Sequence, residues 1–303
     1  MFYGKFTSFF NVKEVLKVNF EISDRLLLKL KRNNKIFLNG NICRIDERVN
    51  VGDEVSVLID FEEDNSNIVP TKMNLDIIYE DDAYIVINKP SGIPVHPSML
   101  HYENSLSNGL KYYFDSIRLK KKIRPVNRLD KDTSGIVIFA KNEYVQEALI
   151  KQMKSKTFKK EYFAICDGSF SSDLYSGTIN APIARKENSI IERCISISDG
   201  QTAITDYEVL QELTIGSDCF SIVKCHLQTG RTHQIRVHMS AIGHPLLGDT
   251  LYGSSSPSSL INRQALHSYK ISFVHPISKK TLKFTSNLPD DMKIFTSRDT
   301  HNR

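Results

Sequence analysis

Residues 124–140 read RPVNRLDKDTSGIVIFA and join an unusual loop to an unbroken apolar run. The run Ile136–Ala140 has the length and composition of a strand buried within a sheet. In the loop before it, a leucine separates Arg128 from Asp130, and the triplet Thr133-Ser134-Gly135 closes the loop. A carboxylate fixed by a tight turn among cations is ionised and held still. The loop therefore predicts either a structural turn cap or an anionic functional group.

Outward from this run, the chain is rich in strands. A helix is predicted at Asn142–Ser155, with Val145, Leu149 and Met153 on one face. Apolar or alternating stretches predict further strands at Leu75–Tyr79, Ala83–Asn88, Glu161–Cys166, Thr202–Leu210 and Phe220–Leu227. This order has too many strands for a doubly wound sheet, so it predicts an α+β domain with a mixed, mostly antiparallel sheet.

Composition along the chain divides it into four pieces. Residues 1–62 are expected to form a small α+β domain, and the polar stretch 63–74, which carries Pro70, reads as a linker. Residues 75–290 form the main domain, and residues 291–303 are expected to be a flexible tail.

In the small domain, Ser23 is positioned to cap a helix with an apolar face of leucines. Arg25, Lys29 and Arg32 share another face of that helix, where they could bind phosphates or simply be solvated. Asn39-Gly40 then predicts a tight hairpin turn, because both positions of such a turn need positive φ.

The bulk composition is that of a globular protein, with 40% hydrophobic residues, 25% charged residues and a net charge of +5. No apolar run approaches the roughly 18 residues that cross a bilayer, and no signal peptide is evident, so a cytoplasmic location is expected. Five scattered cysteines without a C-x-x-C pair argue against a disulfide framework and a zinc knuckle.

Basic residues are concentrated in two stretches. Eight lie between Lys111 and Lys131, and five lysines, including Lys159 and Lys160, lie between Lys151 and Lys160. Local basic density with a modest net charge favours one polyanion-binding face. Tyr162 follows these lysines on a predicted strand, where it could pack in the core or stack on a base.

The segment Leu227–Gly253 brings together arginine and histidine residues. Arg231 follows Gly230 at an expected helix start, from which it could reach a carboxylate. The histidines are His233, His238 and His244. They lack an H-E-x-x-H pair, a cysteine partner or ligand carboxylates at metal spacing, so structural histidines are expected and no metal.

Taken together and in order, these segments resemble the RluA-type family of RNA pseudouridine synthases. The motifs that carry the resemblance are INKPSGIPVHP (Ile87–Pro97), NRLDKDTSG (Asn127–Gly135), KKEYFAICDG (Lys159–Gly168), TGRTHQIRVH (Thr229–His238), HPLLGDTLYG (His244–Gly253) and ALHSYKISFVHP (Ala265–Pro276). The small domain is similar to the RNA-binding domain of ribosomal small-subunit protein four, which the family often carries.

The resemblance assigns roles to particular residues. It implies that Asp130 is the catalytic aspartate, that Arg231 pairs with it, and that Tyr162 stacks against the uracil. Arg128 would fill the space left by an extruded base. The family's motif usually has histidine where this chain has Asn127, which cannot carry a proton at neutral pH.

The expected function is therefore isomerisation of uridine in RNA without a cofactor, with large-subunit ribosomal RNA favoured over tRNA and a monomer favoured. Asp130 would act on the ribose either by attacking the anomeric carbon or by removing the neighbouring sugar proton; the sequence leaves both routes open. The alternatives are a non-catalytic RNA-binding ribosome-assembly factor and a metal-dependent hydrolase.

Overall fold

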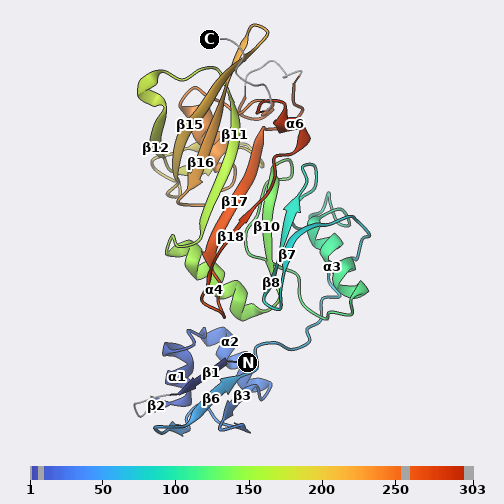
Figure 1. Ribbon diagram of the computed structural model, residues 1–303, viewed down its shortest axis with the longest axis vertical. Coiled ribbons are helices and arrows are strands. Elements are labelled where there is room, and N and C mark those ends of the chain that lie inside the picture. Colours follow the sequence, from blue (N-terminus) through green and yellow to red (C-terminus); the bar gives the residue numbers. More distant parts are fainter. Residues whose placement is uncertain (1, 6–9, 254–259, 297–303) are drawn as a thin grey trace.

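The computed structural model describes residues 2–5, 10–253 and 260–296. The chain forms a small N-terminal part and a large part, connected by an irregular segment (Figure 1). The small part holds a four-stranded sheet, a two-stranded sheet and two helices. Their bounds are β1 (Phe2–Lys5), β6 (Glu54–Val57), β3 (Ile36–Leu38) and β4 (Asn41–Ile42) in sheet order, β2 (Phe10–Asn11) with β5 (Arg48–Val49), α1 (Val12–Val18) and α2 (Asp24–Arg32).

Local chemistry explains the small part. The Ser23 hydroxyl accepts a hydrogen bond from the Leu26 amide at 3.1 Å, so the predicted cap of α2 is confirmed. Asn39 and Gly40 have φ of 49° and 80°, which gives the predicted β3–β4 hairpin. Helix α1 was not predicted, although a capping box at its first turn defines its start.

The large part is built on one ten-stranded sheet. The main path runs β12 (Ser176–Asn180), β15 (Ile204–Ile215), β16 (Asp218–Leu227), β11 (Lys159–Asp167), β17 (Leu266–Val274), β10 (Ser134–Ala140), β8 (Tyr84–Lys89) and β7 (Asp76–Glu80), with β18 (Thr281–Thr285) on β17 and β9 (Arg124–Pro125) on β10. Among the strand pairs of the described residues, only β10 and β17 run parallel. The predicted mixed, mostly antiparallel α+β sheet is confirmed.

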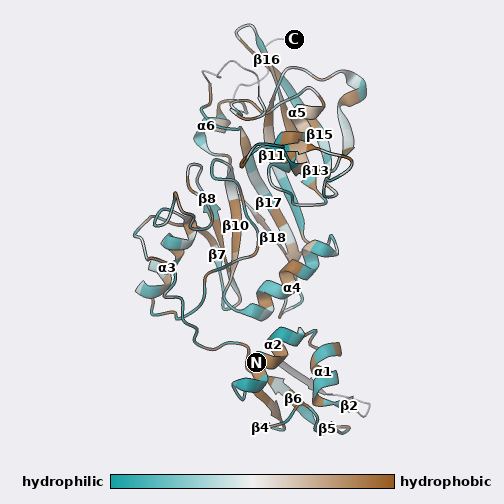
Figure 2. Cartoon of the chain, turned by 180° about the vertical axis from the view of Figure 1, so that it is seen from behind, coloured by the Kyte–Doolittle hydropathy of each residue, from teal (hydrophilic) through white to brown (hydrophobic). Residues whose placement is uncertain are grey.

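Strand β10 is buried on both faces, as its unbroken apolar run predicts. Ile136 and Ile138 pack on the side covered by α4 (Glu143–Lys154), within an apolar cluster that continues into the small part. Val137 and Phe139 pack on the opposite side, with α3 (Leu106–Ser116). Figure 2 shows this apolar colour along β10 in the middle of the sheet.

Gly135 allows the close parallel contact between β10 and β17. Its φ is +110°, and a Cβ added there would lie 2.3 Å from the Ser268 carbonyl oxygen. Any side chain would separate the two strands where the loop that carries Asp130 enters the sheet, so the glycine of the loop's closing triplet is a packing requirement.

Several elements of the large part differ from the expectations. Helix α5 (Gln234–Ala241) begins three residues after the expected start at Arg231. A hairpin of β13 (Ile183–Arg185) and β14 (Arg193–Ile195) was not predicted, nor was the short 3-10 helix η1 (Ser172–Leu174). The expected flexible tail is wrong for residues 291–296, because α6 (Asp290–Lys293) is followed by Phe295, only 1% exposed; residues 297–303 lie outside the described part.

Among the described residues, no helix combines the length and apolar character that a membrane crossing requires.

Candidate active site

A cleft of about 1090 Å³ lies where the loop before β10 meets β11 and the segment leading into α5. Its lining includes Asp130, Tyr162 and Arg231, the three residues to which the sequence assigned the chemistry. It also includes Arg128, Lys159 and Lys160. The fold thus brings residues from three distant motifs into one cavity, although their contacts differ from the expected ones.

Asp130 is held at the end of the loop by backbone contacts. Its carbonyl accepts a hydrogen bond from the Thr133 amide at 3.1 Å, which closes the turn before β10. The carboxylate is 27% exposed and faces the cleft. A turn anchored to a buried strand fixes the carboxylate, while its exposure leaves it accessible to a substrate.

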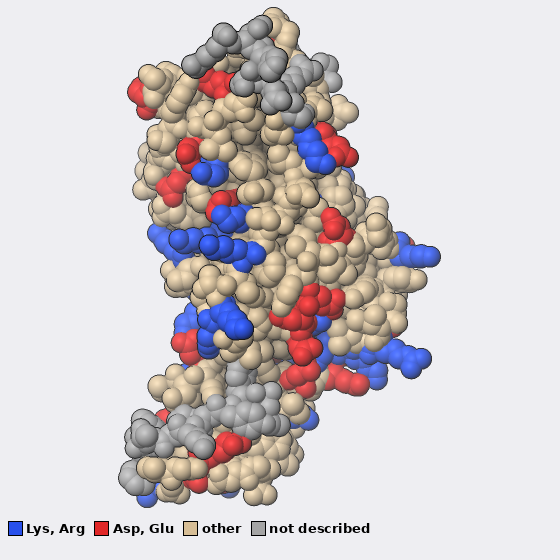
Figure 3. Space-filling model, in the orientation of Figure 1, with Lys and Arg blue, Asp and Glu red and all other residues tan. Residues whose placement is uncertain are grey.

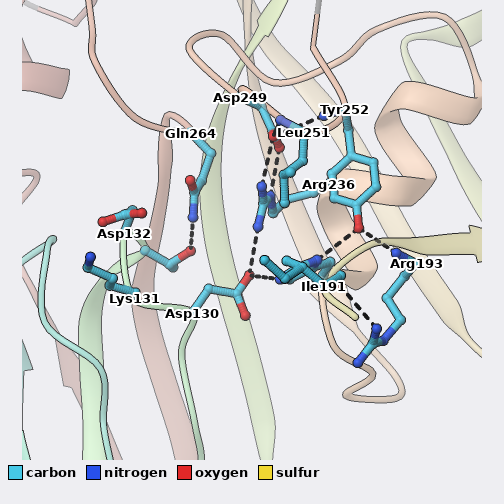
Figure 4. Close-up of polar contacts among 12 residues, drawn as sticks. Asp130, Lys131, Asp132, Ile191, Arg193, Arg236, Asp249, Leu251, Tyr252 and Gln264 are labelled. Atoms are coloured by element: carbon cyan, nitrogen blue, oxygen red, sulfur yellow. Dashed lines mark hydrogen bonds and ion pairs between the residues drawn. The ribbon is translucent and has the colours of Figure 1, made fainter. Parts of the chain in front are cut away.

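The arginine that contacts Asp130 is Arg236, not Arg231 (Figure 4). Arg236 Nη1 lies 3.5 Å from Asp130 Oδ2. The other edge of the guanidinium donates to Asp249, from Nε at 2.7 Å and from Nη2 at 2.8 Å. Asp249 is 3% exposed and Arg236 5%, so this bidentate pair is buried and fixes the direction of Nη1.

The start of α5 explains why the expected pairing of Arg231 with Asp130 is wrong. Because the helix begins at Gln234, Arg231 lies in the preceding turn, is exposed, and donates from Nε to the Thr202 carbonyl at 3.0 Å. Arg236 lies on the first turn of the helix and is buried. A useful sequence signal was Asp249 in the GDTLYG motif, since a buried aspartate requires a cationic partner.

Tyr162 lies on β11 and is 5% exposed within the cleft wall. Burial raises the pKa of its hydroxyl, and the nearby charge of Asp130 raises it further. The phenol therefore stays protonated at neutral pH. This side chain can offer a flat apolar ring beside Asp130, but it does not supply a base.

Lys89 is a site residue that the sequence reasoning missed. It is fully buried and donates from Nζ to the carbonyls of Pro90, Ile93 and Lys131 at 2.7–2.8 Å. Lys131 follows Asp130 in the chain, so Lys89 ties the loop that carries Asp130 to the end of β8. Burial lowers the pKa of Lys89 to about 7. Its place in the INKPSG motif was the available signal.

Asn127 supports the loop from within. Its Nδ2 donates to the Ile136 carbonyl at 3.0 Å, and its Oδ1 accepts from the Ile138 amide at 2.9 Å. The side chain is 6% exposed. At this position, where the family usually has histidine, asparagine bridges the loop to β10 and needs no proton exchange to do so.

The other two histidines of this segment, His238 and His244, contact the protein in different ways. His238 contacts Thr205 Oγ1 at 3.0 Å and the Ala181 carbonyl at 2.9 Å. His244 stacks on Phe170, with ring centroids 3.6 Å apart. Within the described residues, no group of three or more His, Cys, Asp or Glu side chains could hold a metal ion.

The two basic stretches of the sequence have different environments. Around the cleft, the cationic side chains are Arg128, Lys154, Lys156, Lys159, Lys160, Arg231 and Arg236, against the acids Asp130 and Asp206. In the stretch Lys111–Lys131, Arg128 lines the cleft, whereas half of the basic residues pair with acids of this chain: Lys111 with Asp115, Lys120 with Glu62, Lys121 with Asp60 and Arg124 with Glu63.

The basic face of α2 also meets acids of this chain. Lys29 Nζ lies 2.7 Å from Glu63 and 3.1 Å from Glu143, so it is engaged at the junction with the large part. Arg25 contacts Glu143 at 3.0 Å but keeps a side chain that is 85% exposed. Arg32 is exposed at the end of α2. On the face seen in Figure 3, acidic side chains form a strip just above the small part, with basic groups on both flanks.

Comparisons with known proteins identify the family of this chain. The model of the RNA pseudouridylate synthase family matches residues 83–241. An uncharacterized RNA pseudouridine synthase, YhcT of Bacillus subtilis, is 39% identical over 88% of this chain and 83% of its own length. The ribosomal large subunit pseudouridine synthase D of Neisseria meningitidis serogroup A is 36% identical over 88% of this chain and 72% of its own.

A solved structure, human RNA pseudouridylate synthase domain containing 1, superposes with a TM-score of 0.59 at 28% identity, over 71% of this chain and 83% of that one. The chain belongs to the RNA pseudouridylate synthase family, and the protein is an RNA pseudouridine synthase.

Proposed function

We propose that this enzyme isomerises specific uridines of large-subunit ribosomal RNA, with Asp130 as the group that acts on the ribose. The observation that carries the proposal is the placement of Asp130 in a basic cleft, between Arg236 and Tyr162. The relative from Neisseria is named for the large ribosomal subunit, which supports this RNA over tRNA.

The reaction is an internal exchange of bonds. The bond from uracil N1 to the ribose breaks, a bond from carbon five to the same sugar carbon forms, and a proton moves from carbon five to N1. The sum leaves no change in oxidation state, so the protein must bind the nucleotide, hold the detached base and direct one carboxylate to the sugar.

The contacts of Asp130 indicate which of its oxygens reacts. Arg236 Nη1 and His233 Nε2 lie 3.5 Å and 3.9 Å away, and both approach Oδ2. Within the described chain, Oδ1 has no side-chain hydrogen bond or ion pair, so it is the oxygen free to meet the ribose. Oδ1 then either attacks the anomeric carbon or removes the neighbouring sugar proton.

Tyr162 and the cations of the cleft hold the substrate. The target uridine must leave the RNA stack, at a cost of a few kcal/mol. Tyr162 offers a ring on which the flipped base stacks, an interaction worth about 1–3 kcal/mol. Arg128 lies in the loop beside Asp130, where it can fill the gap left in the stack, and Lys159 and Lys160 face the phosphates along β11.

The test is to map pseudouridines across total RNA from a strain lacking the gene, then restore the gene as wild type or as Asp130→Asn. A site should disappear from large-subunit ribosomal RNA and return only with the wild type. Purified Asp130→Asn should still bind RNA, because the change removes a negative charge from a basic cleft. Asp206→Asn, at the other acid of the cleft, should retain product formation.

Three outcomes would contradict parts of the proposal. Product from Asp130→Asn would overturn the role of the carboxylate. A missing site in tRNA would redirect the substrate. The strain lacking the gene could also keep all its pseudouridines but assemble ribosomes poorly. If both the wild-type and the Asp130→Asn gene then restored assembly, the result would favour a non-catalytic assembly factor.

A further inference from the structure

His233 lines the cleft beside Asp130, although the sequence predicted only a structural histidine at this position. It lies just before α5, and its backbone φ of 58° is in the left-handed region, which residues other than glycine adopt infrequently. Its side chain is 10% exposed, and its Nε2 lies 3.9 Å from Asp130 Oδ2. A strained backbone beside a reacting group is a reason to ask what the ring contributes.

The other ring nitrogen of His233 is held by Tyr252. Nδ1 lies 2.8 Å from the Tyr252 hydroxyl, and the two rings meet edge to face at a centroid distance of 5.6 Å. The backbone amide of Arg193, on β14, donates to the same hydroxyl at 2.7 Å. Figure 4 shows Tyr252 between Arg193 and the Arg236–Asp249 pair.

These contacts favour one tautomer of the imidazole. An amide N–H can only donate, so the Tyr252 oxygen accepts from Arg193, and His233 Nδ1 is the one polar partner among the described residues that can accept the hydroxyl proton. In the tautomer that gives this proton an acceptor, Nε2 carries the hydrogen that faces Asp130.

The ring is neutral at neutral pH. Burial lowers the pKa of His233; Arg236 and Arg193 lower it further, while Asp130 and Asp249 oppose them.

We propose that Arg193, Tyr252 and His233 form a hydrogen-bond relay that presents an N–H to Asp130 and makes His233 a positioning residue for the isomerisation. The inference rests on the proposed role of Asp130. The positively charged Arg236 and the His233 N–H both point at Oδ2, from two different directions. Together they fix the orientation of the carboxylate and leave Oδ1 turned to the sugar. The 3.9 Å separation closes on substrate binding, as catalytic hydrogen bonds do when a complex forms.

The relay gives the β13–β14 hairpin a place in the active site. Its contribution is a backbone amide, which donates whatever side chain Arg193 carries. Loss of the Tyr252 hydroxyl should therefore break the relay.

Two substitutions of His233 separate positioning from a structural role. Gln places its amide near the position of Nε2 and can reach Asp130, whereas Asn places its amide near Nδ1 and cannot. Asn, however, tolerates the left-handed backbone and caps helices better than Gln. If His233 positions Asp130, His233→Gln should keep a higher kcat than His233→Asn. If it only shapes the turn, the order should reverse.

Tyr252→Phe should lower kcat about tenfold with little change in KM, as expected for the loss of a hydrogen bond that orients a charged group. Tyr175→Phe removes a hydroxyl bonded to Glu212, away from the cleft, and is the matched control. Nitrogen-15 NMR of the imidazoles, with the His233 signals assigned by their absence in His233→Asn, should show the Nε2–H tautomer in the wild type and its loss in Tyr252→Phe.

A wild-type kcat in Tyr252→Phe, or an Nδ1–H tautomer in the wild type, would overturn the relay. Because Asp130→Asn tests the carboxylate separately, an inactive Asp130→Asn together with a fully active Tyr252→Phe would reject the relay and keep the proposed function.

Discussion

Arg231 and Arg236 lie in one motif of the sequence, but their side chains make different contacts in the structure. Arg236 points its guanidinium from α5 into the buried space between Asp130 and Asp249. Arg231 lies on the exposed turn before the helix and contacts a backbone carbonyl. A guanidinium that is directed by one carboxylate can orient another, because its donors are fixed in a plane.

Substitution of Arg236 should therefore change mainly kcat, and substitution of Arg231 should change mainly KM. Arg236→Lys keeps a positive charge but loses the planar fork, and we expect kcat to fall about 100-fold, the scale seen when one preorganised donor is removed. Arg231→Gln should raise KM and lower the salt dependence of RNA binding while kcat is retained. Steady-state kinetics on an RNA substrate measure both, and equal losses of kcat would contradict the assignment.

At the scale of elements, the contact between β10 and β17 positions the loop that carries Asp130. Ser134 and His267 are paired in the parallel register, and the Ser134 hydroxyl lies 2.9 Å from His267 Nδ1. His267 Nε2 lies 3.3 Å from the Ser286 carbonyl, so Nε2 carries the hydrogen and Nδ1 accepts. This buried neutral histidine links β10, β17 and the segment after β18.

Burial lowers the pKa of His267 to about 4, and this makes the contact between β10 and β17 sensitive to acid. The folded state binds the proton of His267 more weakly than the unfolded chain does. The contribution of neutral His267 to the free energy of unfolding is therefore complete above about pH 6.5 and is lost as the pH falls towards 4. The loss amounts to about 3 kcal/mol in the free energy of unfolding. Urea titrations between pH 4 and 7 should show a shallower decline for His267→Gln than for the wild type, with His101→Gln as the control.

Gly135→Ala tests the close approach of the same two strands. The new Cβ would overlap the Ser268 backbone at 2.3 Å, and we expect the free energy of unfolding to fall by more than about 3 kcal/mol. Gly216→Ala is the matched control, because that glycine also has positive φ but open space around it. Its cost should be about 1 kcal/mol, from backbone strain alone. Similar losses in the two variants would show that strain, not overlap, dominates at Gly135.

At the scale of the whole molecule, ion pairs join the small part to the large one. Glu63, with a side chain that is 7% exposed, lies between Lys29 of α2 and Arg124 of the loop that leads to Asp130. Ser23 also donates to Glu147 of α4 at 2.9 Å. The small part is therefore held next to α4, the helix whose last residue, Lys154, lines the cleft.

Glu63→Gln should loosen this junction. Two partly or fully buried cations lose their carboxylate, and we expect stability to fall by about 2 kcal/mol and residues 64–74 to become easier to cleave by proteases. Glu62→Gln removes an exposed pair with Lys120 and should cost less than about 0.5 kcal/mol. Denaturant unfolding and limited proteolysis make the comparison; equal behaviour of the two variants would contradict the role of Glu63.

Much of the architecture could be predicted locally. The cap at Ser23, the Asn39-Gly40 turn and the apolar run 136–140 depend on interactions within a few residues, so periodicity and turn chemistry were sufficient to find them. The start of α5 was not found, because His233 enters the helix in a left-handed conformation that only its tertiary contacts support. The hairpin of β13 and β14 packs on α5 and contacts Tyr252, and no local pattern in its sequence specifies these partners.

The order of residues was enough to predict the class of fold and the family, and to place Asp130 and Tyr162 in motifs that carry chemistry. The three-dimensional contacts were needed to show that Arg236 meets Asp130, that Tyr252 holds the histidine facing it, and that Lys29 of α2 pairs with acids at the junction. A motif specifies residue types along the chain, whereas an ion pair depends on which side chains point into the same buried space. That space is formed by elements more than a hundred residues apart, as Asp130 and Arg236 are.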